Sequence, residues 1–206
     1  MSKHSAMDNF FKIRAEKQAH IINAGLTVFG KQGYRKASMA DIAKEADTTK
    51  GMITYYFGSK KTLYLYLIEN TQEIFNHEVK RRIGSQPNDF FKTFRVLISI
   101  QSDTVKEHPA YFVFANSIYY ENDPEVLEDI RQIATNNQAF FDQLVLNNAG
   151  LSKLDPDIDP QVLLKLLSWA NDGFVTELYD KGFEHIDALV ADCYKALDML
   201  EQAFYK

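Results

Sequence analysis

The chain has 206 residues and a formal net charge of −5, and it is 46% hydrophobic and 25% charged, which excludes an intrinsically disordered protein. It has only five prolines and nine glycines, and its apolar runs are no longer than those at 96–100 and 110–115, so neither a turn-rich all-β fold nor a membrane-spanning helix is expected. The N-terminal residues contain no apolar signal core and the single cysteine, Cys193, excludes a disulfide framework, so a cytoplasmic protein is expected.

Charge is divided unevenly along the chain. Residues 1–61 carry a net charge of +6, whereas residues 62–206 carry a net charge of −11. This asymmetry is typical of a basic region that faces a polyanion, attached to an acidic body. Charge clusters are also common on faces that only meet water, so the interpretation depends on a motif within the basic part.

The N-terminal region is expected to form three helices. The apolar pattern predicts a helix over 9–31, with Gly33 near its C-terminal cap, and a short helix over 39–46 with apolar residues at i, i+3, i+4 and i+7. A third helix is expected to follow Thr49 and to end near Phe57.

Turn and cap residues mark the boundaries of these short helices. Ser38 and Asp41 have the spacing of a capping box at the start of the second helix. A tight turn is expected at 46–48, in which Asp47 tolerates a left-handed conformation, and Thr49 is the expected cap of the third helix.

The rest of the chain is expected to be helical nearly throughout. A long helix over 60–82 follows the break at Gly58 and Ser59, and further helices are predicted over 88–107, 109–121, 124–148, 160–181 and 184–205. No strand pattern, internal repeat or glycine-rich phosphate loop is visible in the sequence. The five histidines have no metal-ligand spacing with a second ligand type, so neither a metal site nor a cofactor is predicted. The predicted fold class is all-α.

Two short helices joined by a three-residue turn match a helix-turn-helix. On the third helix Ile53, Tyr56 and Phe57 share one side by their i, i+3, i+4 spacing, so the opposite side presents the polar set Lys50, Gly51, Thr54 and Tyr55. This set combines a cation, hydroxyl groups and an aromatic edge, which suits contacts with DNA. The alternative is an ordinary helical hairpin whose polar face meets water.

Basic residues flank this helix on both sides. Lys60 and Lys61 lie in the first turn of the long helix, where the helix dipole disfavours cations unless an anion docks there. Tyr34, Arg35 and Lys36 form a second cluster immediately before Ser38. Both clusters are placed to hold the DNA backbone on either side of a groove.

This stretch resembles the N-terminal domain of TetR-type repressors. The residues that carry the resemblance are Phe29, Gly33, Tyr34, Ser38, Ile42, Ala43, Ala46 and the run from Thr49 to Lys60. The resemblance implies an N-terminal three-helix helix-turn-helix DNA-binding domain over 9–58 and a larger helical ligand-binding and dimerisation domain over 59–206. The chain departs from the family pattern at Asp47, where glycine is usual, and at Thr54, where tyrosine is common, so no operator sequence is inferred.

The resemblance also implies roles for individual residues. Tyr56 and Lys60 are implied phosphate contacts, Lys50 and Gly51 major-groove contacts, and Thr54 and Tyr55 base readers. The full set of expected DNA-binding residues is Tyr34, Arg35, Lys36, Ser38, Thr49, Lys50, Gly51, Thr54, Tyr55, Tyr56 and Lys60.

The last two long helices are expected to form a dimer interface, as in TetR-like proteins. The final helix has a heptad-like apolar seam, which is typical of helices that pair side by side. The expected interface residues are Leu163, Leu167, Ala170, Leu178, Ile186, Val190, Cys193, Leu197 and Leu200. The alternative, that each seam faces its own chain's core, must hold for part of each helix.

Aromatic residues are concentrated between 75 and 120, and with a few polar groups they suit an apolar ligand cavity. The residues proposed to line it are Phe75, Phe91, Phe94, Tyr111, Phe112, Asn116, Tyr119, Trp169, Asn171 and Phe174. Any single one of them could instead be plain core.

No catalytic set of nucleophile, base and orienting group is visible, so an enzyme is not expected. The function predicted from the sequence is a homodimeric, sequence-specific transcriptional regulator, most simply a repressor released from a palindromic operator on double-stranded DNA by a small, largely apolar effector. The alternative is a helical protein-interaction or architectural DNA-binding protein without ligand control.

Overall fold

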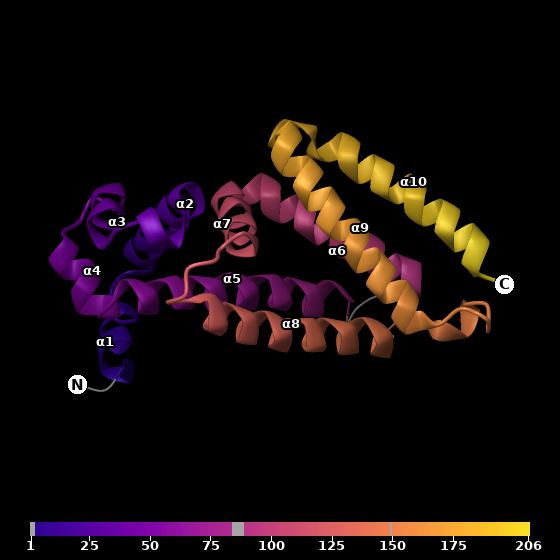
Figure 1. Ribbon diagram of the computed structural model, residues 1–206, viewed down its shortest axis with the longest axis horizontal. Helices are drawn as coiled ribbons and strands as arrows, with labels where there is room; N and C mark the ends of the chain where they lie inside the picture. The colour runs from indigo at the N-terminus through magenta and orange to yellow at the C-terminus, as the bar shows by residue number, and fades with distance from the viewer. Residues whose placement is uncertain (1–2, 84–88, 149) are drawn as a thin grey trace. The chain divides into compact units, whose positions relative to one another are not determined.

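The computed structural model describes residues 3–83, 89–148 and 150–206, which form ten α-helices and two short 3-10 helices (Figure 1). Two compact units are present: one contains the residues up to Ile74 together with His108–Ala134, and the other contains Phe75–Glu107 together with Thr135–Lys206. Helices α5 (Lys60–Ile83) and α8 (Leu127–Asn148) contribute to both units. The all-α fold class is confirmed.

The first unit is built from short helices around an aromatic core. It contains α1 (Lys3–Phe10), α2 (Ala15–Lys36), α3 (Met39–Glu45), α4 (Lys50–Phe57) and α7 (Pro109–Tyr119), with the first parts of α5 and α8. The rings of Phe29, Tyr34, Tyr64 and Phe114 are fully buried and contact one another, with the Phe29 and Tyr64 centroids 4.9 Å apart. Because Phe114 belongs to α7, this core joins α7 to the N-terminal helices.

The approach of α7 to α2 depends on Gly30. A Cβ atom at Gly30 would lie 3.0 Å from Val113 Cγ1 and 3.1 Å from the backbone nitrogen of Phe114. These distances are shorter than ordinary van der Waals contact, so the two helix backbones come close only because residue 30 lacks a side chain.

The helix is interrupted where a continuous helix from residue 9 was expected. Helix α1 ends at Phe10 and α2 begins at Ala15, so the prediction of one helix over 9–31 is wrong at its start. Phe10 is fully buried against α4 and α5, and Gln18 Nε2 donates hydrogen bonds to the carbonyl oxygens of Phe11 and Ile13 at 3.3 and 2.8 Å. The break follows from these tertiary contacts, because residues 11–14 contain neither proline nor glycine.

The predicted caps and turns are confirmed. Ser38 accepts a hydrogen bond from the backbone N–H of Asp41 at 3.2 Å, and Thr49 accepts one from the N–H of Met52 at 3.2 Å. Asp47 has a φ of 45°, which is the left-handed conformation expected of it. Gly33, with a φ of 70°, interrupts α2 with a kink before its last residues.

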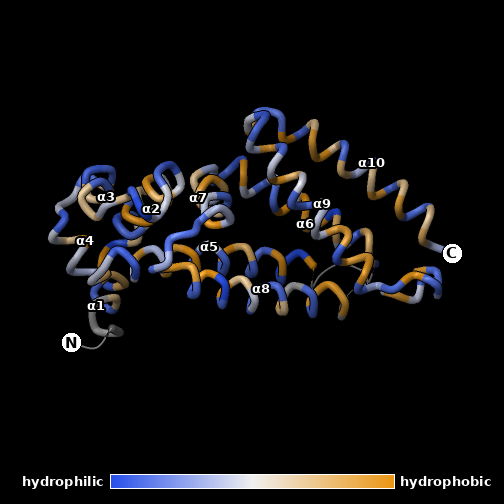
Figure 2. Tube along the Cα trace, in the orientation of Figure 1, coloured by the Kyte–Doolittle hydropathy of each residue, from blue (hydrophilic) through white to orange (hydrophobic). Residues whose placement is uncertain are grey.

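The second unit is built from long helices. It contains the later parts of α5 and α8 with α6 (Phe90–Glu107), α9 (Pro160–Lys181) and α10 (Ile186–Phe204), and the 3-10 helices η1 (Leu151–Lys153) and η2 (Phe183–His185). Along α10, apolar and polar segments alternate from turn to turn (Figure 2). The predicted start of a helix at residue 88 lies outside the described residues, and α6 is described from Phe90.

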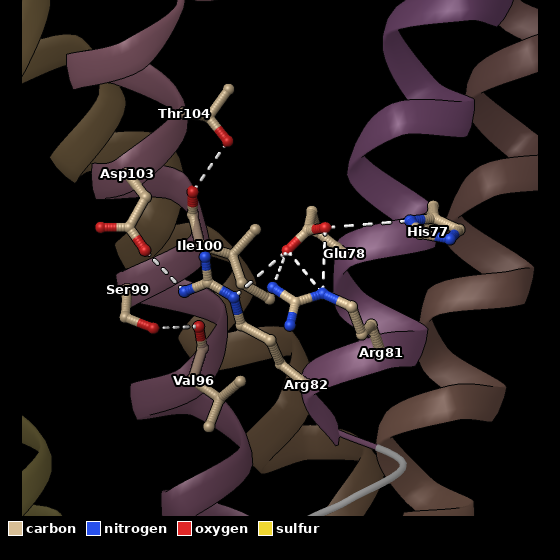
Figure 3. Close-up of polar contacts among 9 residues, drawn as sticks. All are labelled: His77, Glu78, Arg81, Arg82, Val96, Ser99, Ile100, Asp103 and Thr104. Atoms are coloured by element: carbon tan, nitrogen blue, oxygen red, sulfur yellow. Dashed lines mark hydrogen bonds and ion pairs between the residues drawn. The ribbon is translucent and has the colours of Figure 1, made fainter.

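A polar network joins α5 to α6 within this unit (Figure 3). Glu78 accepts hydrogen bonds from Arg81 Nη2 at 2.6 Å and from Arg82 Nε at 3.3 Å. Arg82 also donates from Nη1 to Asp103 Oδ2 on α6 at 2.5 Å. The hydrogen bonds from Arg81 lower the pKa of Glu78, so this carboxylate is charged when the network forms.

The C-terminal end of the chain is attached to the start of α6. The buried carboxylate of Asp89 accepts hydrogen bonds from Lys153 Nζ at 2.8 Å, from the Tyr205 hydroxyl at 2.9 Å and from the backbone N–H of Lys92 at 3.0 Å. Leu154 and Tyr205 form an isolated antiparallel bridge beside it. Burial would raise the pKa of Asp89, but these hydrogen bonds outweigh it and lower the pKa.

Candidate nucleic-acid interface

Helices α3 and α4 form the predicted helix-turn-helix, and α4 presents a polar face to solvent. Ile53, Tyr56 and Phe57 are buried on one side of α4, as the sequence predicts. Lys50, Gly51, Thr54 and Tyr55 are exposed on the other side, and 55% of Tyr55 is accessible. The exposed side therefore gathers a cation, a hydroxyl group, a backbone without a side chain and an aromatic ring within two turns of one helix.

Tyr56 lies on the buried side of α4, although it was expected to contact phosphate. Its ring packs edge-on against Phe10 of α1 at 5.8 Å and against Tyr55 at 5.5 Å. Tyr56 thus supports the exposed ring of Tyr55 from behind. A phosphate contact by Tyr56 stays a prediction.

The basic cluster before α3 divides into a buried and an exposed part. Tyr34 is buried in the aromatic core, whereas Arg35 and Lys36 are exposed. Ser38 and Thr49 act as the N-terminal caps of α3 and α4. The structure therefore brings Arg35 and Lys36 to the surface immediately before the helix-turn-helix.

Lys60 folds back onto this segment. Its Nζ donates hydrogen bonds to the carbonyl oxygens of Tyr34 at 2.9 Å, Ala37 at 3.2 Å and Arg35 at 3.5 Å, and it lies 4.2 Å from the centre of the Tyr34 ring. These bonds place a cation where the last turn of α2 presents free carbonyl oxygens. Lys60 therefore fixes the segment before α3, and its contact with phosphate stays a prediction.

Acidic residues at the junction of α7 and α8 contact the basic residues of this interface. Asp123 Oδ2 lies 3.1 Å from Arg35 Nε, and Asp129 Oδ2 lies 2.6 Å from Lys61 Nζ. A backbone hydrogen bond from Glu125 and the Arg35 hydrogen bond lower the pKa of Asp123. These ion pairs cannot be predicted from the sequence, because Arg35 and Asp123 are 88 residues apart and no local signal connects them.

The residues expected to line a ligand pocket are divided between the two units. The first unit contains Tyr111, Phe112, Asn116 and Tyr119, and the second contains Phe75, Phe91, Phe94, Trp169, Asn171 and Phe174. Phe91 and Phe94 are buried in the core of the second unit, whereas Trp169 and Asn171 are exposed there. In the first unit Phe112 and Asn116 are buried and Tyr119 is exposed.

Each unit contains a groove that one of these residues lines. In the second unit Trp169 lines a groove of about 670 Å³ whose other walls come from α8 and α9 and include Asp142, Val162, Leu164 and Lys165. In the first unit Tyr111 lines a groove of about 280 Å³ beside α2 and α5. The ligand pocket stays a prediction.

Most of the expected dimer residues face their own chain. Leu163, Leu167, Leu178, Ile186 and Leu197 are buried in the second unit, Val190, Cys193 and Leu200 are partly buried, and Ala170 is exposed. The large apolar residues that α9 and α10 leave exposed are Val162, Leu166, Trp169, Tyr179 and Met199. Burial raises the pKa of the Cys193 thiol, which keeps it protonated at neutral pH.

The described residues provide neither a helix that could span a membrane nor a cluster of metal ligands. No helix among them is both long enough and apolar enough to cross a membrane. No group of three or more histidine, cysteine, aspartate or glutamate side chains in the described part of the chain could hold a metal ion.

Residues 21–67 match the model of the family described as "Bacterial regulatory proteins, tetR family". This match covers α3, α4 and most of α2. It therefore includes both helices of the helix-turn-helix.

Two relatives are regulators of the helix-turn-helix type. The transcriptional regulator HbdR of Aromatoleum sp. (strain CIB) is 32% identical over 72 residues, which are 35% of this chain and 31% of HbdR. The transcriptional repressor NicS of Pseudomonas putida is 30% identical over 93 residues, which are 45% of this chain and 43% of NicS. The chain thus spans less than half the length of these two relatives.

The fold as a whole is similar to that of a solved repressor. SmeT of Stenotrophomonas maltophilia, in a complex with triclosan, superposes with a TM-score of 0.72 at 20% sequence identity, covering 93% of this chain and 92% of SmeT. This likeness extends the similarity from the N-terminal helices to the larger helical part that follows them.

Proposed function

We propose that this chain, whose residues 21–67 match the model of the tetR family of bacterial regulatory proteins, is a dimeric, sequence-specific regulator of transcription. In its simplest form it is a repressor that a small, largely apolar effector releases from a palindromic operator. It acts on DNA in the cytoplasm and has no catalytic role.

The observation that carries this proposal is the exposed face of α4. Lys50, Gly51, Thr54 and Tyr55 lie together on a helix whose other side is buried, and α3 and the capped turn hold that helix in place. A recognition helix in the major groove requires a rigid backbone and a few side chains that reach base edges. Arg35 and Lys36 lie beside this face and are placed to contact phosphate.

The proposed dimer contact is formed by exposed apolar residues of α9 and α10. Five of the nine residues expected at the interface are buried within the chain, so we place the contact on Leu166, Ala170 and Met199, which are exposed. A helix-turn-helix protein reads two half-sites one helical turn apart when two copies are joined by a two-fold axis. A second copy on α9 and α10 supplies that axis.

The effector site is proposed at the groove beside Trp169. Its volume of about 670 Å³ is in the range of small-molecule sites, and Val162 and Leu164 give it apolar walls. SmeT, which has a similar fold, is solved with triclosan, a small molecule. Trp169 is the only tryptophan of the chain, so its fluorescence reports directly on a ligand that enters this groove.

The proposed function is tested by selecting bound duplexes from a random DNA pool with the purified full-length chain. We expect a palindrome with half-sites about one helical turn apart, bound more tightly than a shuffled duplex of the same composition. If no duplex is enriched at moderate salt, the chain is not a sequence-specific regulator. Equal binding to all duplexes would instead favour the architectural alternative.

A further inference from the structure

We infer that the junction of α7 and α8 competes with DNA for the basic residues of the interface, with Asp123 and Asp129 in the places of two backbone phosphates. This inference rests on the proposed function, since it concerns how tightly the same face binds DNA. The residues from Glu121 to Asp129 are called the acidic corner below. Its contacts with Tyr34, Arg35 and Lys61 lie within the first unit.

The acidic corner is fixed in place by Glu121. Its Oε2 accepts a hydrogen bond from the backbone N–H of Tyr34 at 2.8 Å, and its Oε1 accepts from the N–H groups of Asn122 and Asp123 at 3.0 and 2.9 Å. Tyr34 follows the kink at Gly33, so the corner is attached to the segment that carries Arg35. A carboxylate held by three N–H donors cannot move without losing these charge-assisted hydrogen bonds.

Asp123 is a fixed partner and Arg35 a mobile one. Asp123 Oδ1 accepts from the N–H of Glu125 at 3.0 Å while Oδ2 binds Arg35, and only 15% of its side chain is exposed. The side chain of Arg35 is 71% exposed. Arg35 can therefore turn from Asp123 to a phosphate without moving the backbone, whereas Asp123 stays behind.

A second pair repeats this arrangement at the start of α5. Lys61 Nζ lies 2.6 Å from Asp129 Oδ2, and both side chains are about a third exposed. Lys61 occupies the first turn of α5, where free backbone N–H groups and an ammonium would together attract a phosphate. Asp129 belongs to the first turn of α8, so the two pairs come from the same corner.

Competition of this kind lowers affinity without altering base preference. A cation that already has a carboxylate partner must lose that partner before it neutralises a phosphate. Because an exposed ion pair contributes little free energy, each pair weakens DNA binding only about two- to fivefold. Phosphate contacts carry no sequence information. The acidic corner therefore sets how tightly all duplexes bind.

The test replaces each acid by its isosteric amide. Asp123→Asn keeps an oxygen that accepts from the N–H of Glu125 but loses the charge, and Asp129→Asn does the same for Lys61. The matched control is Glu128→Gln, which removes one charge from the same corner at a side chain that is 86% exposed and 4.0 Å from Arg131. The dissociation constants for the selected palindrome and for a shuffled duplex are measured at several salt concentrations.

We expect Asp123→Asn to bind both duplexes about two- to fivefold more tightly than wild type, and the double variant about tenfold, with Glu128→Gln close to wild type. In an Arg35→Ala background most of the gain from Asp123→Asn should disappear, because the cation that hydrogen-bonds to Asp123 is gone. The inference is overturned if Asp123→Asn gains no more than Glu128→Gln, or if its full gain persists without Arg35.

These outcomes separate the inference from the proposed function. If no duplex is preferred but Asp123→Asn still tightens binding to all of them, the proposed regulator is wrong and the acidic corner stands. If a palindrome is preferred and Asp123→Asn behaves as the control does, the regulator stands and the acidic corner is wrong.

Discussion

The two compact units differ in what they leave at the surface. In the first unit the exposed large hydrophobic side chains come from several helices, and most of them are aromatic: Phe11, Tyr55, Ile74, Tyr119 and Tyr120. In the second unit α9 and α10 expose Val162, Leu166 and Met199 along their length. The first unit thus spreads its exposed apolar side chains over several elements, whereas the second gathers them on α9 and α10, where a partner or a ligand would cover them together.

The largest expected effects come from placing a glutamate at one of two nearby positions on α10, one buried and one exposed. Leu197 is buried, so Leu197→Glu should bury an unpaired carboxylate and destabilise the second unit by about 3–5 kcal/mol. Met199 is 66% exposed, so Met199→Glu should leave the fold intact and weaken association between chains. Thermal unfolding measures the first effect and sedimentation the second. A fully stable Leu197→Glu variant would contradict the placement of this helix.

The aromatic core of the first unit can be tested at its N-terminal end. Phe10 packs against Phe57 with ring centroids 4.8 Å apart, so Phe10→Ala should lower the free energy of unfolding by about 3–5 kcal/mol. Phe11→Ala is the control, because Phe11 is mostly exposed and its loss should cost much less. Urea unfolding measures both. Equal effects would show that α1 does not belong to the core.

The attachment of the C-terminus in the second unit should make stability depend on pH. The pKa of Asp89 is lowered in the folded chain, so its ionised form stabilises the fold above the ordinary pKa of 3.8. That contribution should be lost as the pH falls from 3.8 through the folded value. Asp89→Asn should cost about 1.5–3 kcal/mol at neutral pH and should flatten this part of the profile. An unchanged acid profile would indicate that Asp89 is not coupled to folding.

Two glycines, one in each unit, should respond to alanine with opposite signs. Gly30→Ala places a Cβ against α7 and should destabilise the first unit by about 1–3 kcal/mol. Gly173 lies in α9 with nothing within 4 Å of its would-be Cβ, so Gly173→Ala should stabilise the second unit by about 0.5–1 kcal/mol. Differential scanning calorimetry on both variants checks the signs. A stabilising Gly30→Ala would mean that α7 and α2 are further apart.

The sequence by itself determined the boundaries of α3 and α4 and the two faces of α4. Ser38 and Thr49 cap α3 and α4 by accepting hydrogen bonds from N–H groups three residues further along the chain, and Asp47 turns the chain between the two helices. Such signals act between residues that are close in the chain, so they can be read without knowing the fold. The face of α4 follows in the same way from the helical period.

Only the tertiary structure decided which cations are engaged and which apolar seams are covered. Phe10 ended α1 by entering a core formed by α4 and α5, and Asp123 met Arg35 across 88 residues. Leu197 is buried within its own chain, although the apolar seam of α10 has the heptad-like period of a dimer contact. Helical periodicity tells which residues share a side, but what covers that side depends on elements distant in the chain, whose packing leaves no local trace in the sequence.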